Sequence, residues 1–188
     1  NQYLSALTGD GRIIVASSGN DCQMPTYMHK AVYQDSAFCR LYTIYDQSRL
    51  MVATDGGPLM VTIADPQGKG MVTLDCTHLD IDSLITDSVW MQTKGMGVRI
   101  TVQRYSAPMA GVEKAYNILL DISTQAGGNR DMKLIVKGHG TDIQTIANSY
   151  NVKMLPDQGD AESGHLVMGP AYMDRVIAVG ATARRLAW

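Results

Sequence analysis

The sequence is poor in the features that would tie a protein to a membrane or a polyanion. No apolar run approaches the roughly 18 to 20 residues needed to cross a bilayer. The polar opening, Asn1-Gln2, is unlike a signal peptide, so we expect none within these residues. The 188 residues carry a formal net charge of -2, which gives no strong positive field. We therefore expect no nucleic-acid partner and no membrane association.

Metal-binding patterns are scarce as well. The three cysteines, Cys22, Cys39 and Cys76, lack the paired short spacings of a Cys/His zinc site. The acidic stretch 80–87 lacks the Asx-x-Asx-x-Asx-Gly loop of a calcium site and is expected to be a solvated connection. We expect no metal and no cofactor. Cys39 and Cys76 are expected to be small buried strand residues, while a disulfide that involves Cys22 remains open.

The middle of the chain is rich in short stretches that alternate between apolar and polar residues. The clearest of these are residues 59–63, 98–102, 116–122 and 132–136. Turns rich in Gly, Pro, Asn and Asp separate them. About eight short strands at such spacing predict an antiparallel β-sandwich or jelly roll. The abundant methionines are expected to fill gaps in its core.

The two ends of the chain follow a different pattern. Residues 3–7 have apolar side chains at helical spacing, and the glycines at 9 and 11 end that pattern. Residues 13–16 (Ile-Ile-Val-Ala) and 176–179 (Val-Ile-Ala-Val) are continuous apolar runs. Such runs are typical of strands that are covered on both faces in a parallel sheet, so the ends are expected to be α/β material.

Two longer segments resemble a known family. Residues 11–21 read Gly-Arg-Ile-Ile-Val-Ala-Ser-Ser-Gly-Asn-Asp, and residues 169–181 read Gly-Pro-Ala-Tyr-Met-Asp-Arg-Val-Ile-Ala-Val-Gly-Ala. They resemble two consecutive core strands of the subtilisin-like serine proteases: the strand that ends in the oxyanion-hole asparagine, and the strand that follows it. In that family a short loop normally joins the two, although some bacterial members carry a β-sandwich there. Here residues 21–168 intervene.

The resemblance implies three parts. Residues 1–28 and 163–188 would be the N-terminal and C-terminal stubs of a subtilisin-like catalytic core, and residues 29–162 a β-sandwich insertion domain. Residues 13–16 and 176–179 would then be neighbours in one parallel sheet. The expected fold is mainly β, an antiparallel β-sandwich or jelly roll flanked by short α/β segments. By the same resemblance the protein would be extracytoplasmic, either secreted or in the cell envelope.

The resemblance also implies a site at the end of the first stub. Asn20 stands where the family's asparagine donates its side-chain amide to the oxyanion of the tetrahedral intermediate. Ser18 and Gly19 would border the pocket for the side chain that precedes the scissile bond. The implied partners are a peptide or protein substrate and the remainder of the parent protease domain.

The catalytic triad is missing from this sequence. His139 lies in Gly-His-Gly-Thr, which copies the sequence around the family's histidine, but that histidine precedes the oxyanion asparagine in chain order and His139 follows it. Neither the Gly-Thr-Ser-x-Ala of the nucleophile nor the Asp-Ser/Thr-Gly of the aspartate occurs. The chain alone is therefore expected to be inert, with its chemistry dependent on residues elsewhere in the parent.

Two functional hypotheses follow. The first is an insertion domain that shapes substrate access, contacts a propeptide or mediates assembly of the parent protease. The alternative is a stand-alone β-sandwich module that binds carbohydrate or protein. Exposed aromatic rings on one sheet face, for instance at Trp90 or Tyr105, would favour the alternative, whereas a glycan array with no hits, together with termini that lie close together in space, would favour the insertion.

Overall fold

The computed structural model describes residues 13–17, 27–32, 36–105, 114–125, 130–139, 141–147, 152–155, 159–162 and 176–179. The regular structure in these ranges is almost entirely β, with one 3₁₀ turn, η1 (Gln92–Lys94). No helix in the described part of the chain is long and apolar enough to cross a membrane. The helix expected at residues 3–7 lies outside the described residues.

The chain divides into two compact units. Unit 1 combines Asn1–Met24 with Ser163–Trp188, and unit 2 is Pro25–Glu162. Each unit is described by itself below.

Unit 2 contains a seven-stranded sheet in which every neighbouring pair is antiparallel. In spatial order its strands are β13 (Ala161–Glu162), β2 (Tyr27–Val32), β11 (Thr141–Ala147), β4 (Gln47–Thr54), β9 (Lys114–Thr124), β8 (Met96–Arg104) and β7 (Leu84–Met91).

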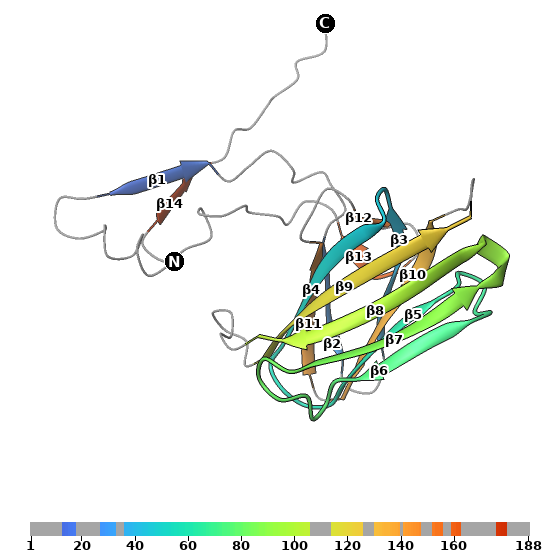
Figure 1. Cartoon of the computed structure of the whole chain (residues 1–188). Coiled ribbons are helices and arrows are strands. Elements are labelled where there is room, and N and C mark those ends of the chain that lie inside the picture. Colours follow the sequence, from blue (N-terminus) through green and yellow to red (C-terminus); the bar gives the residue numbers. More distant parts are fainter. Residues whose placement is uncertain are drawn as a thin grey trace, which may run out of the picture. The chain divides into compact units, whose positions relative to one another are not determined.

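A second antiparallel sheet packs behind the first (Figure 1). Its five strands, in spatial order, are β12 (Val152–Leu155), β3 (Ser36–Thr43), β10 (Asp131–Gly138), β5 (Leu59–Ala64) and β6 (Met71–Asp75). The predicted sandwich is therefore confirmed, and the four stretches with the clearest alternation lie in β5, β8, β9 and β10. The strands of this unit number twelve, β2 to β13, instead of about eight.

The additional strands have weaker sequence signals. His29 is part of β2 and stacks on Tyr27 with 6.3 Å between ring centroids. Residues 84–87 of the acidic stretch open strand β7 instead of forming a connection. That strand is an edge strand, and most of its side chains are exposed, which explains why it reads as polar.

The core lies between the two sheets and follows the alternation along each strand. In β8 the side chains of Met96, Val98, Ile100 and Val102 are buried, while Arg99 points to solvent. Because successive residues of a strand face opposite sides of the sheet, each strand contributes one apolar row to the interior. Five of the fully buried side chains are methionines, which confirms their packing role: Met28, Met91, Met96, Met132 and Met154.

Two large buried polar side chains, Tyr116 and Asp131, have hydrogen-bond partners. Tyr116 is fully buried, and its hydroxyl donates to the carbonyl oxygen of Cys76 at 3.3 Å. The Nε–H of Arg40 donates a bifurcated hydrogen bond to both oxygens of the buried Asp131 carboxylate, with N···O distances of 2.6 and 2.8 Å. Removing Arg40 would leave this buried carboxylate without its main partner, which is costly.

Unit 1 contains a parallel pair of strands. β1 (Ile14–Ser17) pairs with β14 (Val176–Val179), with Ile14 opposite Val176 and Ser17 opposite Val179. The expected pairing of these two segments is therefore confirmed. Parallel neighbours need a long crossover connection, which is usually a helix. In this chain the connection contains the whole of unit 2.

The two buried thiols provide a test of the core. Cys39 and Cys76 are free, and burial raises the pKa of each thiol to about 12, with a further contribution from Asp160 and Asp75 respectively. At pH 8 only on the order of one such thiol in ten thousand is ionised. We predict that iodoacetamide leaves both unmodified in the folded chain at pH 8, measured by peptide mass spectrometry.

Denaturant provides the control, since both thiols should then react as quickly as a model thiol. The neutral thiols are favoured by folding, so their contribution to stability is present below about pH 9 and is lost as the pH rises toward 12. Fast labelling of either cysteine in the folded chain would contradict the packing described here.

Candidate functional site

The strand that leads to the predicted oxyanion residue is present in the expected pairing. β1 ends at Ser17, opposite Val179 of β14. Ser18, Gly19 and Asn20 follow directly in the sequence and lie outside the described residues, so their roles stay predictions.

The histidines that the structure describes do not form a catalytic arrangement. His139 is exposed and lies in a bend directly after β10, in the non-catalytic context that its chain order suggested. His78 lies in the turn after β6. Among the described residues, no three His, Cys, Asp or Glu side chains come together as a metal site would require.

The chain enters and leaves unit 2 through adjacent strands. β2 is its first strand and β13 its last, and the two pair antiparallel with Tyr27 opposite Glu162 and Met28 opposite Ala161. Neighbouring strands are about 4.8 Å apart. The two ends of this 25–162 unit therefore emerge side by side. We call this pairing, together with Gly159 and Asp160, the junction.

Asp160 ties the junction to both sheets. Its carboxylate accepts hydrogen bonds from Nζ of Lys30 on β2, at 3.1 Å, and from the backbone N–H of Phe38 on β3, at 2.9 Å. Its own backbone N–H donates to the carbonyl oxygen of Phe38 at 2.7 Å. Because β2 and β3 belong to different sheets, one residue fixes the exit of the chain against both layers of the sandwich.

Gly159 makes this close approach possible. Its φ of +144° is a conformation that side chains rarely adopt. A Cβ at this position would overlap the carbonyl oxygen of Phe38 and lie only 3.0 Å from Cα of Cys39. Position 159 therefore accepts only glycine, because any side chain there would collide with the backbone of β3.

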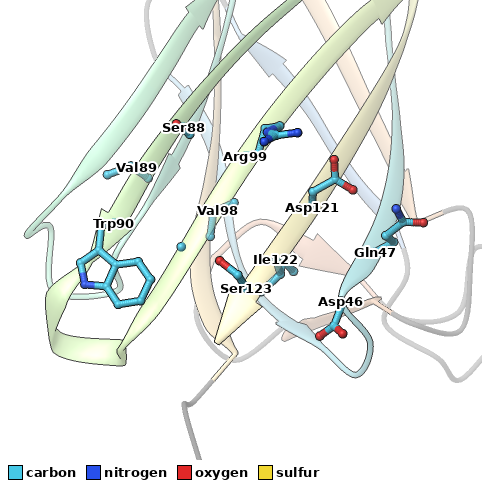
Figure 2. Close-up of a pocket in the computed structure, with 11 residues that line it drawn as sticks. Asp46, Gln47, Ser88, Val89, Trp90, Val98, Arg99, Asp121, Ile122 and Ser123 are labelled. Carbon is cyan, nitrogen blue, oxygen red and sulfur yellow. The ribbon is translucent and has the colours of Figure 1, made fainter. Parts of the chain in front are cut away.

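A groove of about 640 Å³ lies on the outer face of the seven-stranded sheet, over β7, β8, β9 and the start of β4 (Figure 2). Trp90 on β7 stands opposite Gly97 on β8, which in turn is opposite Ser123 on β9. A Cβ at Gly97 would lie 3.1 to 3.2 Å from the indole ring. The ring therefore rests on the bare backbone of Gly97, and Trp90 remains 48% exposed.

Next to Trp90, polar side chains form a row across the sheet. Asp121 on β9 is the Cα partner of both Arg99 on β8 and Gln47 on β4. Its Oδ1 atom is buried and has no hydrogen-bond partner within the described part of the chain. It is one of five buried side-chain polar atoms without a partner among the described residues, and the one of the five that lines the groove. We call Trp90, Arg99, Asp121 and Gln47 the groove residues.

The sequence reveals only part of this arrangement. Trp90 is visible as one of two tryptophans, and alternation along residues 98–102 predicts that Arg99 faces away from the core. Nothing in the sequence tells which residue of β9 lies beside Arg99, or which residue of β4 lies beside Asp121, because strand register is a long-range property. The sequence does not reveal the junction either, since Lys30 and Asp160, which are hydrogen-bonded there, are 130 positions apart.

The described residues thus define a mainly β protein in which an antiparallel sandwich is carried on the connection between two parallel strands. No protein-family model and no curated protein matches the sequence. Among solved structures, the chain is similar in fold to the CspB protease of Clostridium perfringens, with 13% identity and a TM-score of 0.62. The match covers 91% of this chain and 35% of that protein, so the chain spans about a third of the protease.

The junction predicts a large effect at one glycine and a small effect at another. Replacing Gly159 by Ala forces a Cβ against β3 and should lower the free energy of unfolding by roughly 2 to 4 kcal/mol. Gly68→Ala is the matched control: φ there is also positive, +76°, but no atom lies within 4 Å, so the cost should be only about 1 kcal/mol. Urea denaturation measures both, and equal midpoints would argue against the close approach.

Proposed function

We propose that this chain is the insertion domain of a subtilisin-like serine endopeptidase, together with the two core strands between which it is inserted. The observation that carries the proposal is the parallel register of β1 and β14 across an intervening unit whose own ends lie side by side. A domain with adjacent ends can interrupt a host loop without moving the host strands apart. The resemblance of residues 11–21 and 169–181 to core strands of subtilisin-like proteases leads us to propose a host of that family.

The parallel pair of β1 and β14 supports the proposal that the parent contains a larger sheet. Parallel sheets normally have both faces covered, and two strands alone are marginal in water. In unit 1, Ile13 is 71% exposed and Val15 is 61% exposed. We infer that the remaining strands and helices of the parent protease domain cover these side chains.

The likeness to the Clostridium perfringens protease supports the same reading. It covers 91% of this chain, which is more than residues 25–162 contribute, so it extends into the flanking residues. The match to only 35% of the protease is what a fragment of a larger enzyme would give.

In the proposed mechanism this chain supplies the oxyanion hole and the parent supplies the triad. The Asn20 side-chain amide donates a hydrogen bond to the negative oxygen that forms when the nucleophile attacks the scissile carbonyl. Ser18 and Gly19 border the pocket for the preceding substrate side chain. The aspartate, histidine and serine come from the rest of the parent. The substrate is a peptide or protein, and the family resemblance leads us to propose an extracytoplasmic location.

The sandwich would act on access to this site. Five peptide steps separate Asn20 from Pro25, and an extended chain spans at most about 3.5 Å per residue. The stretch of chain from Asn20 to the start of unit 2 is therefore at most roughly 18 Å long. A sandwich held on so short a stretch would screen large substrates or hold a propeptide, whereas short peptides would pass freely. The exposed rings of Trp90 and Tyr105 agree with a stand-alone binding module, but such a module gives no reason for β1 and β14 to pair.

Replacement of Asn20 by alanine in the full-length parent tests the site. Loss of one oxyanion donor should lower kcat by about 10²- to 10³-fold and leave KM nearly unchanged, because the hydrogen bond forms only in the transition state. Steady-state kinetics on a chromogenic peptide, normalised by active-site titration, measures this. An unchanged turnover number would remove Asn20 from the proposed oxyanion hole.

A deletion tests the insertion. Replacing residues 25–162 of the parent by a short Gly-Ser linker should be tolerated, because the two ends of the unit are adjacent. We expect the deleted enzyme to keep most of its activity on a short peptide, while kcat/KM on a folded protein substrate changes by roughly tenfold or more. An unfolded deletion protein would show that unit 2 is an integral part of the parent core and is not inserted into it.

A further inference from the structure

The groove on the outer face of the seven-stranded sheet contains aromatic and polar side chains that neither the proposed hydrolysis nor the packing of the core requires. The groove residues are on the surface away from the core. Yet the same groove contains a half-exposed aromatic ring and, two strands away, a buried carboxylate oxygen that has no partner among the described residues. Features of this kind, concave and with a few convergent polar groups, are typical of ligand sites.

We propose that this groove binds a neutral carbohydrate chain, with Trp90 as the stacking platform and Asp121, Arg99 and Gln47 as the polar contacts. The proposal is independent of the protease assignment, because it uses only the surface of unit 2.

The platform is preorganised. Because position 97 has no side chain, the indole rests against the strand backbone, and Figure 2 shows the ring face-on in a view onto the outer side of the sheet. A ring in this position offers a flat apolar surface to solvent. One face of a pyranose ring carries mainly C–H groups, and such a face packs well on a flat aromatic ring.

The row formed by Arg99, Asp121 and Gln47 matches the hydroxyl groups around the edge of a sugar ring. Each hydroxyl group both donates and accepts. The Asp121 carboxylate accepts, the Arg99 guanidinium donates, and the Gln47 amide does both. With about 4.8 Å between neighbouring strands, the row from β8 through β9 to β4 spans roughly 10 Å. That length suits a short oligosaccharide, whose hydroxyls would supply the partner that Asp121 Oδ1 lacks.

Peptides and anions fit this groove less well. Strands β8, β9 and β4 each have a neighbour on both sides, so within the groove a peptide strand could extend the sheet only at the edge strand β7, away from the row of Arg99, Asp121 and Gln47. Of the two carboxylates in the groove, Asp46 is paired with Arg130 at 2.6 Å, which leaves Asp121 against the one lining cation, Arg99. The groove therefore has no excess positive charge to attract a phosphate or polyuronate, whereas a neutral sugar needs none.

A glycan array provides the first test, with the whole 188-residue chain as the probe. The array carries neutral hexose and N-acetylhexosamine oligosaccharides of α and β linkage, with uronic acid oligosaccharides for comparison. We expect binding to a neutral class. Calorimetry with the best soluble oligosaccharide then gives the dissociation constant.

Variants locate the site. Trp90→Ala and Asp121→Asn should each weaken binding roughly tenfold or more, with the stacking surface or the charged acceptor removed. Tyr105→Ala is the matched control, because Tyr105 is another exposed aromatic residue, beyond the opposite end of β8, and its loss should change the constant by less than about twofold. Thermal melts confirm that each variant is folded.

Fluorescence reports the contact directly. The chain has two tryptophans, so Trp188→Phe leaves Trp90 as the source of the indole emission. Its emission should change during titration with the oligosaccharide. Three results would overturn the proposal: no array binding with none by calorimetry at millimolar oligosaccharide, binding that survives Trp90→Ala, or a peptide that displaces the sugar and binds more tightly. None of them would bear on Asn20 or on the insertion.

Discussion

The rest of the structure depends on one constraint, the return of the chain to its starting sheet. β1 and β14 are parallel neighbours, so the polypeptide must leave at the end of one and come back to the start of the other. An unstructured connection of this length would have its ends far apart on average. The pairing of Tyr27 with Glu162 removes that difficulty, since the intervening unit presents its two ends as adjacent strands. The entropic cost of bringing the two ends of such a connection together grows only slowly with its length.

The sandwich itself is held by two kinds of interaction that act in different places. Between the sheets, the contacts are apolar, and methionine side chains fill the irregular gaps. At the perimeter, a few hydrogen-bonded charges fix one sheet against the other, with Asp160 the clearest example. The apolar contacts supply most of the stabilisation, while the polar ones specify how the layers meet.

Local sequence patterns predicted the parts of the fold that local physics determines. The alternation in residues 98–102 and 116–122 marks β8 and β9 because a two-sided sheet imposes a period of two. The continuous apolar runs at residues 13–16 and 176–179 mark the parallel pair. The exposed edge strand β7 and the strand β2 were less visible, because their side chains are mixed in character. The row of Arg99, Asp121 and Gln47 could not be predicted, since it depends on the register of strands far apart in the chain.

The junction also determines how the sandwich would respond to mechanical load. Tyr27 and Glu162 lie at the same end of the β2–β13 ladder, so a force that draws the two ends of the unit apart acts across the ladder and not along it. Hydrogen bonds loaded in that direction open one pair at a time. β13 has only two residues, so the tension would soon reach Asp160, whose bonds to Lys30 and Phe38 are the next to resist. Asp160 therefore sets the point at which separation of β13 from β2 would stop, through its salt bridge and its backbone hydrogen bonds.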